Sequence, residues 1–182
     1  MIYPIVAYGT PVLKKVAQDI EKGEDLSQLI EDMFETMEQA NGIGLAAPQI
    51  NKSIRLFIID TTNTDEEDES KKVRKAFINA YIIEEDGEEW AFEEGCLSIP
   101  DVHADVSRHE RIRMKYFNEN WEEKEEVFDG IMARVIQHEY DHIEGVLFTD
   151  YVKGLKKKLM NKKLTNISKG KITPRYKMKF PK

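Results

Sequence analysis

The sequence has little of what a secreted or membrane protein needs. It has one cysteine in 182 residues, so it cannot form an internal disulfide, and a reducing cytoplasm is the expected location. No apolar run approaches the roughly 20 residues that span a bilayer, so no membrane partner is expected. Its first residues, Met1 to Pro4, lack a basic stretch followed by an apolar core, so no signal peptide is predicted.

Acidic residues are missing from the last part of the chain. Residues 151–182 hold 12 of the 27 Lys and Arg residues and none of the 34 Asp and Glu residues. The net charge of −7 therefore combines a strongly acidic body with a basic tail. Such a tail favours an anionic partner. The length and the 41% hydrophobic content are typical of one compact domain.

What is present is centred on the stretch from Gln137 to His142. Residues four apart lie one above the other on a helix, so His138 and His142 can direct two imidazole nitrogens at one metal ion, with Glu139 beside them. Asp129 can cap this helix and Gly145 can end it. Two histidines and a carboxylate on one buried helix face are costly without a cation, which favours a metal site over two core histidines.

A catalytic metal needs a third protein ligand and one open position. The zinc peptidase pattern that continues past H-E-x-x-H would place its last histidine at position 148, which is Phe148. Beyond Glu144 the only acid is Asp150. The third ligand should therefore lie upstream, and the candidates include Cys96, His103, His109 and many carboxylates.

Two further strings accompany the histidine helix. One runs from Glu94 to Ser98 and contains Cys96, and the other is the Gly-Ile-Gly-Leu-Ala-Ala-Pro-Gln string of residues 42–49. The glycines remove Cβ atoms where a ligand backbone could approach closely, and Gln49 supplies a neutral amide donor. With these three strings in this order, residues 3–165 resemble peptide deformylase. The resemblance implies a catalytic domain over 1–165, with 166–182 as a basic tail on the same domain.

The resemblance also implies a chemistry. One divalent ion would be held by Cys96, His138 and His142, with Fe²⁺ as the cellular ion and Zn²⁺, Ni²⁺ or Co²⁺ as alternatives. Glu139 would be the general base, while the Gln49 amide and the Leu97 backbone N–H would stabilise the oxyanion. The reaction would remove the N-formyl group from the methionine of a nascent formyl-methionyl polypeptide and release formate. The substrate-binding residues are expected to be Gly42, Ile43, Gly44, Glu94, Arg134 and Val135.

Arg134 and His103 each allow two interpretations. Arg134 lies one helical turn before His138, so we expect its aliphatic stem to line the methionine pocket and its head to reach the rim near Glu94, unless it points to solvent. His103 stands where similar proteins often carry arginine, and it is the second choice for third ligand. Pro48 departs from the small or hydroxyl residue common in the glycine string.

The fold class expected is α+β, with antiparallel strands wrapped around the central metal-binding helix, followed by a basic C-terminal helix and an extended tail. Asp25, with Gln28 as a reciprocal cap, should begin a helix with a methionine-rich core face that ends near Asn41. The pattern predicts strands at 54–60, 76–83, 88–92, 106–118, 121–128 and 146–148, and a solvated loop at 61–75. A basic helix over 152–168 should bury Leu155, Leu159 and Met160. Residues 171–180 alternate apolar and basic, which indicates an extended segment.

Three other functions share parts of these patterns. A zinc endopeptidase shares H-E-x-x-H but needs a long cleft and lacks its downstream ligand here. A zinc-stabilised structural module would prefer four protein ligands. A nucleic-acid-binding protein is suggested only by the basic tail, which could equally dock the enzyme on ribosomal RNA.

Overall fold

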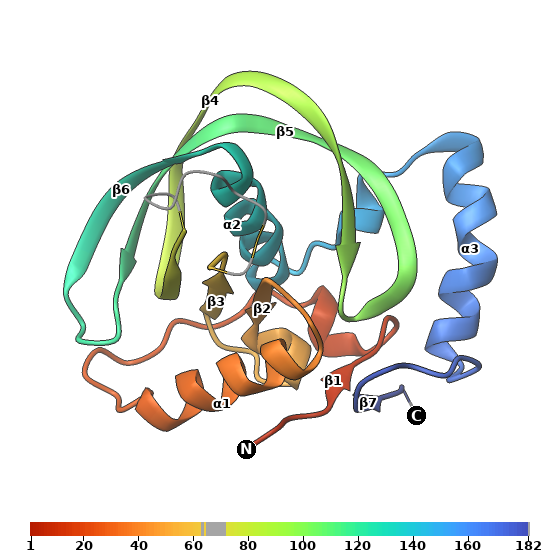
Figure 1. Cartoon of the computed structure of the whole chain (residues 1–182), viewed down its shortest axis with the longest axis horizontal. Helices are drawn as coiled ribbons and strands as arrows, with labels where there is room; N and C mark the ends of the chain where they lie inside the picture. Colours follow the sequence, from red (N-terminus) through yellow and green to blue (C-terminus); the bar gives the residue numbers. More distant parts are fainter. Residues whose placement is uncertain (63, 65–71, 182) are drawn as a thin grey trace.

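The helix that carries both histidines, α2 (Gly130–Ile143), lies at the centre of the molecule, and strands arch around it (Figure 1). A computed structural model describes residues 1–62, 64 and 72–181. The expected α+β architecture, with antiparallel strands wrapped around a central helix, is confirmed. In the described part of the chain, no helix is long and apolar enough to cross a membrane.

Five antiparallel strands form the main sheet, in the order β2-β3-β4-β5-β6. Their bounds are β2 (Gly44–Ala46), β3 (Leu56–Asp60), β4 (Arg74–Cys96), β5 (Ile99–Phe117) and β6 (Glu123–Asp129). The two strands expected at 76–83 and 88–92 are one long strand, β4, and the strand expected from 106 begins at Ile99. Four register shifts between β4 and β5 let this pair curve over α2, since each irregularity adds a local bend (Figure 1).

A two-residue turn joins the long strands. Cys96 ends β4 and pairs with Ile99 at the start of β5, so Leu97 and Ser98 form the tip of a tight hairpin. The cysteine string of the sequence is therefore a hairpin end held next to α2. The sequence analysis did not predict this turn, because the Leu-Ser pair lacks the Asn-Gly or Asp-Gly signal of a two-residue hairpin.

Apolar side chains fill the space between the sheet and the helices. On one side, Phe57 stacks on Phe77 with 4.7 Å between ring centroids, in the same cluster as Ala133 and Ile136 of α2. On the other side, α1 (Ser27–Gln39) buries Met33. The methionine-rich face of α1 is thus core, as expected.

The start of α1 differs from expectation. The N-cap position is Leu26, and the Asp25 carboxylate instead accepts hydrogen bonds from the backbone N–H and hydroxyl of Ser27, at 3.0 and 2.6 Å. Gln28 donates to Asp32 at 2.9 Å and makes no reciprocal cap. The expected capping box is wrong, because the short Asp25 side chain closes a turn one residue before the helix.

The end of α2 follows the sequence expectation. Gly145 has φ +72° and comes directly after the C-cap Glu144. The Gly145 N–H donates to the His142 carbonyl, and the Val146 N–H donates to the Asp141 carbonyl at 2.8 Å. This paired arrangement needs a residue in the left-handed region, which glycine adopts without cost.

Beyond α2 the expectations are partly wrong. Instead of a strand at 146–148 there is a 3-10 turn, η4 (Phe148–Asp150). The basic helix is α3 (Gly154–Ser168), but Leu155 and Leu159 are each 71% exposed, and the helix buries Met160, Leu164 and Ile167. The stripe that packs is thus displaced by one residue from the one chosen on the sequence.

The tail returns to the body. It ends in β7 (Met178–Lys179), which pairs in parallel with β1 (Ile5–Val6) and brings both ends of the chain together (Figure 1). Burial alternates along 171–180 as expected, with the basic residues outward.

Two short 3-10 turns, η1 (Pro11–Lys14) and η2 (Ala47–Ile50), complete the elements. Of the loop expected at 61–75, residues 63 and 65–71 lie outside the described residues, and β4 already begins at Arg74.

Candidate metal centre

Three potential metal donors meet where the β4–β5 hairpin tip reaches α2. The ligand atoms of Cys96, His138 and His142 all lie within 4.8 Å of one another, and Cys96 Sγ is 3.3 Å from His142 Nε2. Burial lowers the pKa of His142 well below its ordinary value, and the nearby His138 lowers it further. A neutral imidazole and a soft sulfur are donors that a divalent transition metal prefers, so the residues present fit such an ion.

Glu94 fixes the orientation of the His138 ring from the side opposite the other donors. Its Nδ1 lies 2.9 Å from Glu94 Oε2, which leaves Nε2 directed at the other donors. Arg108, itself buried, donates to both Glu94 oxygens at 2.7 and 3.0 Å. Burial alone would raise the pKa of Glu94, but the hydrogen bonds from His138 and Arg108 lower it to about 2. An ionised carboxylate behind a histidine sets the tautomer of that ring and raises its basicity as a ligand.

A second carboxylate secures the same arginine. Asp141 accepts a hydrogen bond from Arg108 at 2.8 Å and another from the Tyr151 hydroxyl at 2.9 Å. Sequence reasoning missed Arg108, Asp141 and Tyr151. Asp141 carried a weak signal, because it follows His138 by three residues and so lies on a neighbouring face of the helix.

Glu139 lies beside the donors with one oxygen free. The side chain is buried, and Oε2 has no hydrogen-bond partner among the described residues. Burial raises the pKa of Glu139 to about 7. A carboxylate with that pKa can both accept and return a proton near neutral pH. Gly44 makes room for it, since a Cβ at position 44 would lie 2.8 Å from the Glu139 Cγ and Cδ atoms.

Gln49 faces the donors from η2. Its Oε1 accepts the Ala46 backbone N–H at 2.8 Å, which settles the amide orientation and directs Nε2 inward. Nε2 lies 3.5 Å from Cys96 Sγ and 3.3 Å from the Ser98 hydroxyl. The amide donor expected from the glycine string therefore reaches the site. Leu97 is half-buried at the hairpin tip, next to Gly42, where a Cβ would approach Leu97 Cδ1 to 2.7 Å.

A cavity of about 570 Å³ opens onto Cys96 and His138, two of the three donors, and onto Glu139. All the substrate-binding residues expected from the sequence line it, namely Gly42, Ile43, Gly44, Glu94, Arg134 and Val135. The tail contributes Pro174, Arg175 and Tyr176 to the same wall, which the sequence did not indicate. The cavity is large enough for one amino-acid side chain together with the backbone on either side of it.

Arg134 lines this cavity but does not reach its rim. Its side chain is only 4% exposed, and its guanidinium donates to Glu94 at 3.1 Å and to the Val106 carbonyl at 2.7 Å. It also lies over the Trp90 ring, 4.5 Å from the centroid. The expectation of a contact with Glu94 is confirmed, while both the rim position and the solvent alternative are wrong. These two buried acceptors, together with the part-buried Trp90 carbonyl, hold the guanidinium inward.

The other two candidate third ligands lie apart from the donors. His103 is exposed on the cavity wall and packs over Gly95, where a Cβ would lie 2.8 Å from its Nδ1. His109 lies far along β5, with Nδ1 3.2 Å from the Gly87 carbonyl. Neither joins the donor group found among the described residues.

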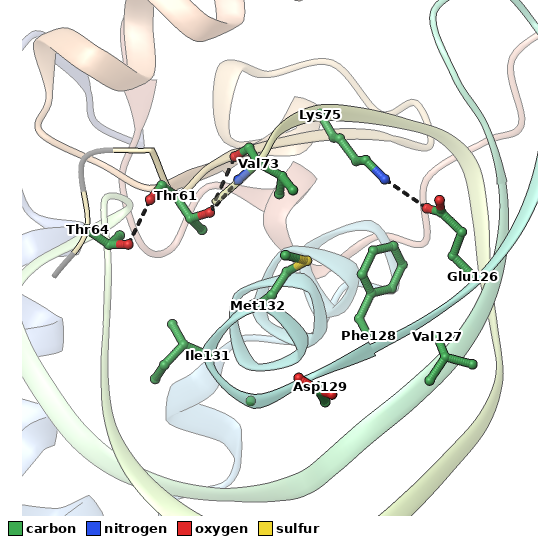
Figure 2. Close-up of a pocket in the computed structure, with 11 residues that line it drawn as sticks. Thr61, Thr64, Val73, Lys75, Glu126, Val127, Phe128, Asp129, Ile131 and Met132 are labelled. Atoms are coloured by element: carbon green, nitrogen blue, oxygen red, sulfur yellow. Dashed lines mark hydrogen bonds and ion pairs between the residues drawn. The ribbon is translucent and has the colours of Figure 1, made fainter. Parts of the chain in front are cut away.

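A second cavity, of about 400 Å³, lies at the start of α2 (Figure 2). Figure 2 shows Phe128 and Met132 beside it, with Lys75 paired to Glu126 at 2.9 Å on its wall. Its described lining contains no member of the donor group. We therefore place no reaction there.

An α+β fold that presses a two-histidine helix against a cysteine-bearing hairpin, with a free buried glutamate beside them, defines a metal-dependent hydrolase. The sequence model of the polypeptide deformylase family matches residues 2–158. The chain is 62% identical to the peptide deformylase of Cytophaga hutchinsonii over 182 residues, which is all of this chain and 98% of the relative. It is 56% identical to that of Christiangramia forsetii, covering 100% and 97%.

Solved structures agree. The crystal structure of peptide deformylase from Thermus thermophilus matches with a TM-score of 0.84 at 36% identity, covering 93% of this chain and 99% of that one. The enzyme from Legionella pneumophila matches with a TM-score of 0.81, also at 36% identity, covering 94% and 98%. The chain belongs to the polypeptide deformylase family, whose members remove the N-formyl group from N-terminal methionine.

Proposed function

We propose that Cys96, His138 and His142 hold the divalent ion of this deformylase, with Glu139 as general base. One observation carries the assignment: the three donor atoms lie within 4.8 Å of one another, beside a buried carboxylate oxygen that has no other described partner. Three protein ligands leave a fourth position open for chemistry. Residues 1–165 would form the catalytic domain, with 166–182 as the basic tail packed on it.

The donor set suits several ions. One thiolate and two imidazoles fit Fe²⁺, Zn²⁺, Co²⁺ or Ni²⁺ and disfavour hard ions such as Mg²⁺. We propose Fe²⁺ in the cell, in line with the resemblance noted on the sequence. Metal analysis of protein purified without oxygen tests this choice, and Zn²⁺ as the dominant ion after anaerobic purification would overturn it.

When bound, the ion would polarise the formyl carbonyl and lower the pKa of a neighbouring water. Glu139 takes a proton from the attacking water and passes it to the methionine nitrogen as the C–N bond breaks. Its pKa of about 7 suits both steps, because the carboxylate is ionised for the first and can give the proton back for the second. The products are formate and a free amino terminus.

The carbonyl oxygen gains negative charge as water adds, and it needs hydrogen-bond donors. We assign the Gln49 side-chain amide and the Leu97 backbone N–H to this role. The Gln49 amide is already oriented by the Ala46 N–H, so its donor costs little to position. Glu94 lines the cavity, but both its oxygens are occupied by Arg108 and His138, so we give it the task of orienting His138.

The remaining cavity residues would hold the methionine. Ile43 and Val135 supply apolar surface, and the stem of Arg134 adds to it. Gly42 and Gly44 border the cavity where the substrate backbone would lie. A side chain of methionine length fits a cavity of about 570 Å³ that also admits the neighbouring peptide bonds.

Formate release is the deciding test. The purified enzyme should release one formate for each formyl-Met peptide consumed, and removal of the metal by a chelator should stop the reaction. An endopeptidase would instead cut internal peptide bonds and release no formate. Cleavage of a peptide that carries an acetyl group in place of the formyl group would also contradict the proposal.

We also propose a cytoplasmic enzyme that docks on the ribosome through its basic segment. α3 exposes Lys156, Lys158, Lys162 and Lys163, while Lys157 turns inward to donate to the Thr149 carbonyl at 2.6 Å. Phosphate contacts from such a segment weaken steeply with salt. Nascent formyl-methionyl chains emerge at the ribosome, so docking would raise their local concentration.

Charge reversal tests the docking. Changing the four exposed lysines of α3 to Glu should abolish co-sedimentation with ribosomes at low salt and leave peptide deformylation unchanged. A matched control reverses four charges on the sheet, at Arg111, Arg113, Lys115 and Lys124, whose surface ion pairs contribute little. Equal co-sedimentation of the two variants would end the docking proposal.

A further inference from the structure

The tip of the β4–β5 hairpin has two carbonyl groups that its own ladder does not use. In a two-residue turn the turn carbonyls face away from the paired strands and need other partners. The Ser98 carbonyl accepts the Tyr8 backbone N–H at 2.8 Å. The Leu97 carbonyl accepts the Tyr176 hydroxyl at 2.6 Å. The two ends of the chain therefore hold two consecutive carbonyls directly after Cys96.

The tail that carries Tyr176 is itself anchored. β7 pairs with β1, and the Ile5 and Ala7 N–H groups donate to the Lys177 and Lys179 carbonyls at 2.9 Å each. The Tyr176 ring packs against the same apolar cluster as the Leu97 side chain. Its hydroxyl is therefore a fixed donor, placed by a strand pair and a packed ring. Residues 174–176 also form part of the cavity wall.

We propose that Tyr176 is a positioning residue for catalysis: by holding the Leu97 carbonyl it limits rotation of the Leu97 backbone, so that the Leu97 N–H, on the preceding peptide, keeps its direction toward the developing oxyanion. The inference rests on the role proposed for that N–H above. An oxyanion donor works only if it is aligned before the charge develops, and a displacement of a fraction of an ångström weakens it. The residue that limits rotation at Leu97 thus acts on the transition state without touching the substrate.

Other described contacts also restrain this stretch, beginning with the pairing of Cys96 and Ile99 in the ladder. The Leu97 side chain rests on Gly42, which limits its position on one face. Tyr8 restrains the next carbonyl through its backbone, which a side-chain substitution cannot remove. The Tyr176 hydroxyl is therefore the restraint that a single atom change can delete.

The test is Tyr176→Phe, which removes one oxygen and keeps the ring in the apolar cluster. With formyl-Met peptide and metal content normalised, we expect kcat to fall about 5-fold, the equivalent of one hydrogen bond, with KM unchanged. Amide hydrogen exchange at Leu97 and Ser98 should become faster. Tyr81→Phe is the matched control, since it deletes a hydroxyl that donates to Asp19 at 2.8 Å, on a residue that does not line the cavity.

The outcomes separate this inference from the proposed function. If the parent enzyme releases no formate, the proposed function itself fails. If the parent is active and Tyr176→Phe keeps its kcat, with only a lower melting temperature, the hydroxyl merely secures the tail and the inference is wrong. A kcat loss of the same size in Tyr81→Phe would also overturn it. Faster exchange at Leu97 together with the lower kcat supports it.

Discussion

The Glu139 side chain occupies the space where a side chain at position 44 would lie. The carboxylate lies so close to the Gly44 backbone that a Cβ would stand 2.8 Å from its Cγ and Cδ atoms, nearer than real Cβ contacts allow. The sequence suggested that this glycine admits the substrate backbone. Gly44 lines the cavity and also contacts the proposed base, so position 44 decides where that base can lie.

Gly44→Ala should lower kcat by roughly 100-fold, because Glu139 must move from its place beside the donors. Metal content should remain, since Glu139 is not one of the three donors. A double-mutant cycle with Glu139→Gln provides the check. If the glycine acts through the base, the two losses will not add, whereas additive losses would assign Gly44 a separate role.

Glu139→Gln alone should keep the metal and lower the rate by roughly 100-fold or more, because the amide cannot take a proton. The measurement is formate release together with metal content by emission spectroscopy. Loss of the metal in this variant would show that Glu139 had been given the wrong role.

Cys96→Ser should reduce the metal content of the purified protein, because a hydroxyl is a harder and far less acidic ligand than a thiol. His103→Ala is the matched control, since His103 lies on the same cavity wall outside the donor group. Retention of metal in the serine variant and its loss in the control would exchange the two assignments.

Arg134→Ala should destabilise the protein by about 2–4 kcal/mol, because it leaves the buried Val106 carbonyl and the part-buried Trp90 carbonyl without this donor and takes one cation from Glu94. The wider pocket should also accept bulkier first residues. Denaturant unfolding measures the first effect, and rates with a series of formylated peptides measure the second. Arg111→Ala, an exposed arginine paired with Asp86, should change neither.

Asp60 predicts a pH dependence of stability. Burial alone would raise its pKa, but hydrogen bonds from Thr62 and the Arg74 guanidinium lower it below the ordinary value. Its contribution is therefore present above about pH 4, the pKa of an unfolded Asp, and is lost as pH falls through the lower folded pKa. Asp60→Asn should destabilise at pH 7 and much less at pH 3. An equal effect at both would mean that charge plays no part.

The sequence predicted those parts of the site that local spacing determines. Two histidines four apart fix their own geometry on a helix, so His138 and His142 could be paired without a structure. Cys96 could be assigned to the site only from its sequence motif and the family resemblance. Its partner strand begins at Ile99, and the turn between them lacks the residues that mark a two-residue hairpin. Arg108 and Tyr176 could not be found in this way. They reach the site from 30 and 34 residues away from His138 and His142, through sheet curvature and strand pairing that no local pattern encodes.

The same limit explains the error in α3. If α3 is considered as an isolated helix, Leu155, Leu159 and Met160 form a plausible apolar stripe. The helix packs beside β5, however, and the rotation that this contact imposes buries Met160, Leu164 and Ile167 instead. A shift of the buried stripe by one residue corresponds to a rotation of about 100° about the helix axis. This rotation is enough to exchange the buried and exposed leucines.

The pairing of β1 with β7 also has a consequence for how the enzyme matures. Ile5 and Met178 are far apart in the sequence, so this pair cannot form until Met178 has left the ribosome tunnel. Contacts of such long sequence separation close late and slowly. The hairpin that carries Cys96 has its own ladder, but the Tyr176 contact with the Leu97 carbonyl depends on the tail, so a chain in which β1 and β7 have not yet paired would lack the restraint proposed for the Leu97 N–H. Full activity should therefore appear only once β7 has paired with β1.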